Sequence, residues 1–201
     1  GATTDDCVEL SKKVGERITK EADIPVFLYE SSASAPHRQN LAAIRKGQFE
    51  GMAEKVMEKA WEPDFGGRRI HPTAGVVAVG ARPPLIAFNI NLSTSDITIA
   101  NNIAKIIRRS SGGLEAVKAI GVMLEERNTA QVSINMTDYT KTPLYRVLEL
   151  VRAEAKRYGV NVIGTELIGL CPMQAMFDSA EYYLQIEEFD SKVQIIENHL
   201  L

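Results

Sequence analysis

The order of the elements predicted between residues 85 and 163 constrains the fold of this chain most. Apolar periodicity and turn signals there predict strand, helix, strand, strand, helix and strand in succession. This order is the split βαβ or ferredoxin-like arrangement, in which both helices cover one face of a four-stranded antiparallel sheet. We therefore expect an α+β fold with a ferredoxin-like (βαββαβ) unit. The predicted elements are strands over 85–92, 117–124, 131–137 and 160–163, a helix begun by a Ser93–Asp96 capping box and ended at 110–113, a helix over 143–158, and further helices from 175 onward.

The first 84 residues are predicted to form a separate, less regular unit. Thr3 and Asp6 have the spacing of a capping box, so a helix should begin there and run to about Lys20. A break rich in glycine and proline over 80–84 indicates a boundary between units, and we divide the chain into 1–84 and 85–201. Shorter elements are expected as strands over 26–29 and 76–79 and as helices over 41–45 and 52–60.

The composition excludes several classes of protein. With 45% hydrophobic and 24% charged residues the 201-residue chain is globular, and a net charge of −3 disfavours nucleic-acid binding. Cys7 and Cys171 stand far apart without a Cys/His cluster, so we expect no disulfide framework, no metal site and a reducing, cytoplasmic compartment. No apolar run approaches the roughly 20 residues that span a bilayer, so no membrane association is expected.

The predicted sheet has one unusual face. Side chains alternate along a strand, so the apolar residues of its two central strands should meet the helices and leave Ala87, Asn89, Asn91, Gln131, Ser133 and Asn135 on the other face. Four amides there could bind a polar or carboxylated ligand, although an ordinary solvated face is an equally good interpretation. An RNA-recognition sheet would carry aromatic residues at these positions, and none is present.

A loop over residues 66–75 is the second candidate site. It combines glycines and prolines with Arg68, Arg69 and His71, which could hold a ligand with several carboxylates or, for His71, exchange a proton. Arg82, just before the first strand of the second unit, could form a bidentate pair with a substrate carboxylate. Ordinary surface roles remain open for all four residues.

Several longer stretches carry a resemblance to a known family. These are WEPDFG at 61–66, HPTAG at 71–75, GAR at 80–82 and LIAFNINL at 85–92, supported by VFLY at 26–29 and by 164–170. Together they resemble the formiminotransferase domain of glutamate formiminotransferases and of formiminotransferase-cyclodeaminases. The resemblance covers nearly the whole chain.

The resemblance implies transfer of a formimino group from N-formimino-L-glutamate to tetrahydrofolate in histidine degradation, without a metal. It implies two ferredoxin-like subdomains with a ligand tunnel between them. The folate contacts of the family fall on Gly66, Gly67, Arg68, Arg69, Ile70, His71, Pro72, Thr73, Ala74 and Gly75. Substrate-binding candidates from the residues themselves are Arg82, Asn89, Asn91, Gln131 and Asn135.

The same resemblance places the family's catalytic histidine upstream of this sequence, so that none of His37, His71 or His199 is assigned as the general base. We expect the chain to correspond to the later part of an N-terminal subdomain followed by a C-terminal subdomain, with no cyclodeaminase extension. A homodimer, or association with a missing N-terminal segment, is the expected assembly. The alternatives are a non-catalytic folate-binding or assembly subunit and a ferredoxin-like interaction module.

Overall fold

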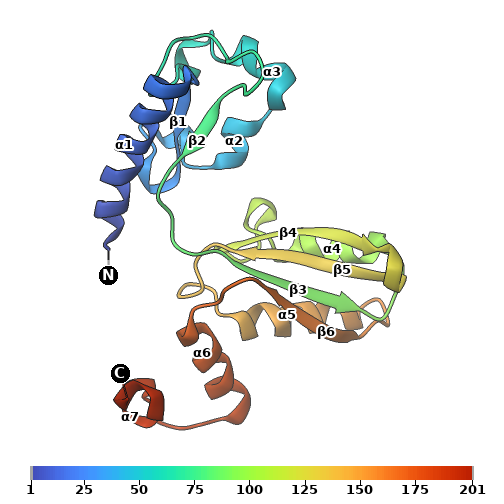
Figure 1. Cartoon of the computed structure of the whole chain (residues 1–201). Helices are drawn as coiled ribbons and strands as arrows, with labels where there is room; N and C mark the ends of the chain where they lie inside the picture. The colour runs from blue at the N-terminus through green and yellow to red at the C-terminus, as the bar shows by residue number, and fades with distance from the viewer. Residues whose placement is uncertain (1, 201) are drawn as a thin grey trace. The chain divides into compact units, whose positions relative to one another are not determined.

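The computed structural model describes residues 2–200 and divides into two compact units, Gly1–Pro83 and Pro84–Leu201. Figure 1 shows both units with their helices and strands. Each unit combines helices with a small sheet, which confirms the expected α+β class.

The first unit is built around two short parallel strands, β1 (Val26–Leu28) and β2 (Val77–Val79). Helix α1 (Thr4–Ala22) packs beside them (Figure 1), and it begins at the predicted capping box, in which Thr3 and Asp6 bond each other's backbone amides. Between the strands lie α2 (Leu41–Arg45), α3 (Gln48–Lys55) and 3-10 turns at Glu30–Ser32, Pro36–Arg38 and Lys59–Trp61. The core of this unit contains Phe27, Ile44, Met52 and Val56, all nearly inaccessible to solvent.

Helix α3 corrects the prediction of a helix over residues 52–60. The chain turns at Gly47, with φ of 93°, and the helix runs only from Gln48 to Lys55. The ammonium of Lys55 donates to the carbonyl oxygens of Ala43 and Ile44, 2.5 and 2.7 Å away, and lies 4.0 Å from the centre of the Trp61 ring. Lys55 thereby satisfies carbonyl groups at the end of α2 that no helical amide can reach.

The second unit contains one four-stranded sheet. Its elements in chain order are β3 (Ile86–Leu92), α4 (Ile97–Ile107), β4 (Val117–Leu124), β5 (Thr129–Met136), α5 (Leu144–Lys156) and β6 (Val162–Ile168). The strands are ordered β4-β5-β3-β6, and every neighbouring pair is antiparallel. The central strands are therefore β3 and β5, as the sequence predicts. Helix α6 (Met173–Leu184) packs on α5 and is followed by α7 (Ser191–Gln194) and a 3-10 turn at Ile196–His199.

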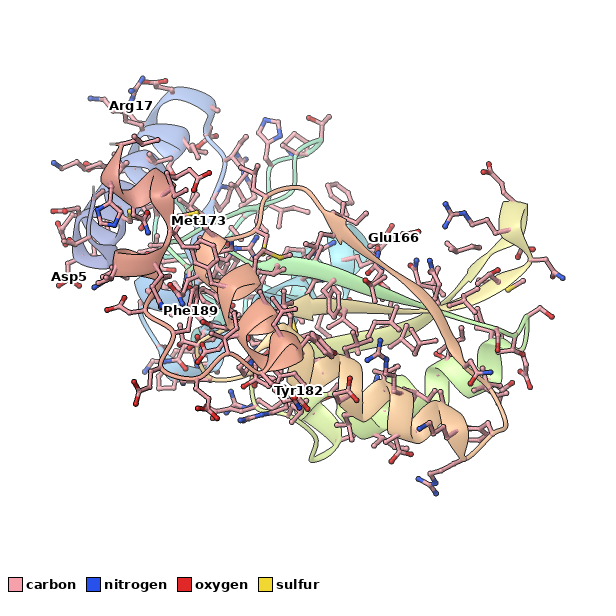
Figure 2. All side chains as sticks on the ribbon, turned by 90° about the horizontal axis from the view of Figure 1, so that it is seen from below. Asp5, Arg17, Glu166, Met173, Tyr182 and Phe189 are labelled. Carbon is pink, nitrogen blue, oxygen red and sulfur yellow. The ribbon has the colours of Figure 1, made fainter. Side chains whose placement is uncertain are left out.

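Helices α4 and α5 both cover one face of this sheet, as Figure 2 shows from below. Alternate residues of β3 point into the core, and among them Ile86 and Ile90 are at most 1% exposed. Complete burial of such a side chain contributes roughly 1.5–3 kcal/mol, so this alternation fixes which face meets the helices. The intervening residues of β3 and β5 are left on the other face.

Several bounds differ from the prediction for this unit; helix α4, for example, ends at Ile107 and not at 110–113. Strand β6 runs from Val162 to Ile168, not over 160–163, because β3 pairs with it along that whole length, with a shift in register at Asn91/Leu92. Helix α4 has no Ser93–Asp96 capping box. Asp96 itself is the N-cap and accepts from the amide of Thr98, whereas Ser93 accepts from the amide of Asn161.

Candidate ligand-binding sites

The uncovered face of the second sheet carries the expected amides, and we call Ala87, Asn89, Asn91, Gln131, Ser133 and Asn135 the amide face. Ala87 lies opposite Asn135 and Asn91 opposite Gln131 in the register of β3 with β5. Gln131 donates from Nε2 to Oδ1 of Asn91 at 2.7 Å, and the two residues are only 4% and 7% exposed. The centre of the face is thus an ordered hydrogen-bonded pair.

Glu166 belongs to the same face and was missed from the sequence. It lies in register with Asn89 on β6, and Figure 2 shows it on the side of the sheet away from α4 and α5. Its carboxylate accepts from Nδ2 of Asn91 at 3.1 Å and from Nε2 of Gln131 at 3.2 Å. The prediction ended the last strand at residue 163. Had the alternation over 164–168 been followed as a strand, Glu166 would have been placed beside the amides.

Arg127 completes this polar group. It donates from Nη1 to Oε1 of Glu166 at 2.7 Å, and the two side chains are 62% and 30% exposed. The hydrogen bond from Asn91, together with those from Arg127 and Gln131, lowers the pKa of Glu166 below its ordinary value of 4.5. Glu166 is therefore ionised at neutral pH.

The other predicted members of the face are more open. Asn89 accepts from the backbone amide of Ile134 at 3.2 Å and is partly exposed. Ser133 is also partly exposed, and Asn135 is exposed near Lys118 on the neighbouring strand β4. Solvent exposure on the amide face therefore increases from the buried polar centre at Asn91 and Gln131 to the exposed end at Asn135.

The loop over residues 66–75 forms a compact turn around His71. The amides of Ala74 and Thr73 lie 3.0 and 3.3 Å from Nδ1 of His71, and the backbones of His71 and Gly75 bond each other in both directions. Because Nδ1 accepts these bonds, the neutral ring carries its proton on Nε2. Nε2 is consequently the ring atom that could contact a ligand.

The two arginines of this loop have intramolecular partners on the surface. Arg68 pairs with Glu62, and this contact lowers the pKa of Glu62 and raises that of Arg68. Arg69 lies 3.6 Å from Asp23, and both side chains are more than 80% exposed. Exposed ion pairs contribute little to stability, so either arginine could exchange its partner for a ligand carboxylate at small cost.

A small pocket of about 160 Å³ adjoins the same loop. Residues from two segments line it, namely Asp23, Pro25, Gly66, Gly67, Arg69, Ile70, His71 and Pro72. Gly66 has φ of 88°, and a Cβ there would lie 3.1 Å from the Cα atom of Pro25. Glycine is required because the two backbones approach closely at this point.

A buried ion pair holds the chain just before this loop. Arg38 and Asp64 lie 2.9 Å apart with side chains 8% and 10% exposed, and Arg38 also donates to the carbonyl oxygens of Ala60 and Glu62. Asp64 in turn accepts from the amide of Leu28 on β1 at 2.7 Å. Sequence reasoning missed this pair, since nothing in the pattern around residue 38 distinguishes a buried arginine from a surface one.

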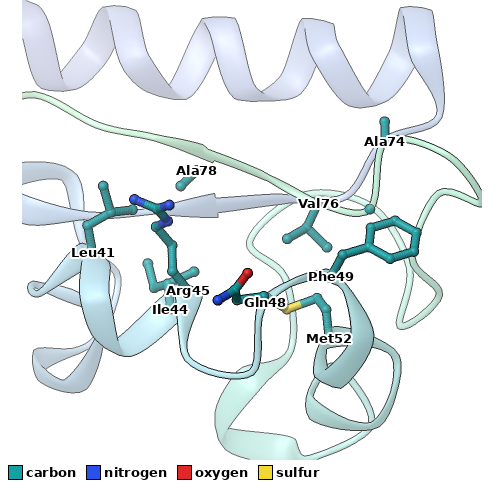
Figure 3. Close-up of a pocket in the computed structure, with 10 residues that line it drawn as sticks. Leu41, Ile44, Arg45, Gln48, Phe49, Met52, Ala74, Val76 and Ala78 are labelled. Atoms are coloured by element: carbon teal, nitrogen blue, oxygen red, sulfur yellow. The ribbon is translucent and has the colours of Figure 1, made fainter. Parts of the chain in front are cut away.

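A larger pocket of about 440 Å³ lies between α2, α3 and β2 (Figure 3). Its apolar lining includes Leu41, Ile44 and Met52, and the ring of Phe49 lies against Gly75. The last two residues of the loop, Ala74 and Gly75, also line this pocket. The loop thus borders two separate hollows of the first unit.

Arg82 lies at the end of the first unit and is exposed. The residue before it is anchored, because Ala81 donates its amide to Oγ of Ser32 and accepts from the amide of Ser31. Arg82 has no ion-pair partner within residues 2–200. Its guanidinium is consequently available to a ligand.

Two further properties concern the part of the chain that the structure describes. It contains no group of three or more His, Cys, Asp and Glu side chains placed to hold a metal ion. None of its helices combines the length and the apolar character needed to cross a bilayer.

Comparison with known proteins supports the resemblance noted in the sequence. Residues 1–82 match the model of the formiminotransferase domain, N-terminal subdomain, and residues 87–200 match that of the formiminotransferase domain. The chain is 64% identical to a "Glutamate formimidoyltransferase" of Streptococcus pyogenes serotype M1, over 99% of this chain and 67% of the relative.

Two more distant relatives also carry formimidoyltransferase names. A "Glutamate formimidoyltransferase" of Thermoplasma acidophilum is 47% identical over 92% of this chain and 61% of the relative. A "Formimidoyltransferase-cyclodeaminase" of Rattus norvegicus is 39% identical over the whole chain and 39% of the relative. The chain thus spans between two fifths and two thirds of the length of these proteins. With both domain models matched and these relatives in agreement, the resemblance is confirmed, and the chain belongs to the formiminotransferase domain family.

Proposed function

We propose that this protein is a glutamate formimidoyltransferase, a transferase that moves the formimino group of N-formimino-L-glutamate to tetrahydrofolate in histidine degradation and one-carbon metabolism. The 64% identity to the Streptococcus relative, over almost the entire chain, carries this proposal. Two relatives with that name favour the enzyme over a non-catalytic folate-binding or assembly subunit. We also infer that the second unit is ferredoxin-like, which its strand order β4-β5-β3-β6 supports.

The reaction needs positioning and proton transfer. The N5 amine of tetrahydrofolate attacks the amidine carbon of the donor and forms a carbon–nitrogen bond. The bond from that carbon to the glutamate nitrogen then breaks, and the proton lost from N5 ends on the departing glutamate amine. Correct placement of two bound reactants and one general base can supply most of the acceleration. In keeping with the resemblance, we assign that base to no residue of this chain.

We assign the folate contacts to the loop over residues 66–75. Its glycines allow close approach of the backbone, and Arg68 and Arg69 are exposed cations suited to the glutamyl carboxylates of folate. We assign the formimino donor to the amide face of the second unit. Arg82, in the first unit, is a separate candidate for binding a substrate carboxylate. Tetrahydrofolate is the acceptor substrate, and the proposal requires no metal.

Assembly and location follow the same family. We propose a cytoplasmic enzyme, which the two free cysteines Cys7 and Cys171 support. Its partners are small molecules, and a homodimer or association with a further N-terminal segment is the proposed assembly.

The direct test is a transfer assay with tetrahydrofolate and N-formimino-L-glutamate, in which 5-formiminotetrahydrofolate and released glutamate are both measured. The chain is assayed alone and together with the part of the Streptococcus relative that lies outside the matched 67%. Equal formation of both products is expected when the second polypeptide is present and not with the chain alone, because the general base is assigned to no residue of this chain. Gln131→Ala serves as the variant with an impaired donor site. Folate binding without transfer even in the presence of the added polypeptide would favour the non-catalytic subunit instead.

A further inference from the structure

Glu166 fixes the orientation of two side-chain amides on the amide face. The carboxylate is ionised and can only accept hydrogen bonds, so Asn91 and Gln131 must both turn their amide nitrogens toward it. Asn91 then has its oxygen free for Nε2 of Gln131, which is the bond observed at 2.7 Å. One negative side chain therefore fixes the orientation of two neighbouring amides.

This orientation leaves two acceptors available next to each other. Oε1 of Gln131 accepts no hydrogen bond from any residue between 2 and 200. Oε2 of Glu166 takes only the 3.2 Å bond from Gln131, because the bonds from Asn91 and Arg127 both end on Oε1. A carboxylate oxygen has a further lone pair to offer. At Gly164, on the same strand as Glu166, no atom lies within 4 Å of the place a Cβ would take, so there is open space beside this pair.

Paired acceptors with a negative charge complement one chemical group in particular. An amidine is protonated at neutral pH and presents N–H donors from a planar, delocalised cation, much as guanidinium does. A formyl group presents a carbonyl oxygen at the equivalent position, which would face the two acceptors without a proton between them. A site of this kind binds the first group better than the second, because the formyl oxygen would face two acceptors and leave both without a donor.

We propose that Oε2 of Glu166 and Oε1 of Gln131 bind the formimidoyl cation of the donor, and that this contact sets a preference for formimino over formyl donors. The inference rests on the proposed function and adds the residues that recognise the transferred group. Arg127 opposes the contact, because its guanidinium is an exposed cation on Oε1 of the same carboxylate. Removing Arg127 should therefore strengthen binding of a cationic donor.

The test is calorimetric titration of the chain with N-formimino-L-glutamate and with N-formyl-L-glutamate, the neutral-group analogue. Glu166→Gln is expected to weaken the affinity for N-formimino-L-glutamate about tenfold or more and to change the affinity for N-formyl-L-glutamate little. Arg127→Gln is expected to tighten formimino binding severalfold and to leave formyl binding unchanged. Glu126→Gln is the matched control. It removes one negative charge, as Glu166→Gln does, but at an exposed position next to Arg127, and it should alter neither affinity.

Each outcome decides the inference. An unchanged ratio of the two affinities in Glu166→Gln, or binding of neither donor by the wild-type chain, would overturn it. If Glu166→Gln loses its fold by circular dichroism, the exposed Arg127→Gln variant decides alone, and equal affinities in that variant and the wild type would overturn the inference. The transfer assay tests the proposed function separately, since a chain can transfer formimino groups and still show no dependence on Glu166.

Discussion

Gln131 and Asn91 are hydrogen-bonded across the two central strands of the second unit, with 2.7 Å between Nε2 and Oδ1. Both are buried, although they lie on the face that α4 and α5 leave uncovered. Each amide is thus held in one orientation by its neighbours. Ordered side chains lose little entropy when a ligand binds, so this pair is suited to recognition as well as to stability.

Replacing Gln131 by Ala should lower both stability and donor use. The change removes a donor from Asn91 and from Glu166, and we expect a loss of about 1–3 kcal/mol in the free energy of unfolding. In the active enzyme we expect at least a roughly fivefold loss of kcat/KM for the donor. Urea denaturation and steady-state kinetics measure the two effects.

Asn135→Ala is the matched change at the exposed end of the same face. It should alter unfolding by no more than about 0.5 kcal/mol, because Asn135 is exposed. A reduced kcat/KM with normal stability in this variant would support a ligand contact along the whole face. Normal kinetics in both variants would exclude the amide face as the donor site.

Charge reversal at Arg68 and Arg69 should raise the folate KM more than it lowers kcat. The glutamyl carboxylates of folate would then meet negative side chains, and the new residue 68 would also face Glu62. Steady-state kinetics with folate as the varied substrate provide the measurement. Reversal at Arg17, another exposed arginine paired within α1, is the control. Folate kinetics unaltered by the loop variants would place the folate site elsewhere.

Arg38→Met should destabilise the first unit strongly. It leaves the buried carboxylate of Asp64 without its cation, and breaking a buried pair in this way typically costs about 3–5 kcal/mol. Arg17→Met breaks an exposed pair with Glu21 and should cost less than about 1 kcal/mol. Thermal and urea unfolding compare the two variants. Similar small losses in both would show that Arg38 contributes no more than a surface residue.

The stability of the second unit should depend on pH through Glu166. Its pKa is lower in the folded protein than its ordinary value of 4.5, so its bonds to Asn91, Arg127 and Gln131 stabilise the fold above pH 4.5. That contribution should disappear as the pH falls through the lowered pKa of the native state. The stability difference between wild type and Glu166→Gln should therefore be present at pH 7 and shrink on acidification below 4.5. A difference that stays constant from pH 7 to pH 3 would contradict this assignment.

Local sequence patterns predicted much of the fold. The capping box at Thr3 and Asp6, the strand over residues 117–124 and the alternation along β3 and β5 were all readable, because each depends on neighbouring residues and on burial of one face. The boundaries that failed depend on a distant partner in one case and on a local turn in the other. Strand β6 extends to Ile168 because β3 offers it hydrogen bonds, and the Gly47 turn decides where α3 begins.

The sequence by itself determined which residues share the uncovered face, since side chains alternate on a strand whatever surrounds it. It also indicated the family, through motifs spread along the chain. Only the tertiary structure brought Glu166 and Arg127 to Asn91, and Arg38 to Asp64, from positions 26 to 75 residues apart. Such contacts depend on strand register and loop closure, which no local pattern specifies. The charge at the centre of the amide face, and hence the donor it is proposed to bind, follows from the folded sheet.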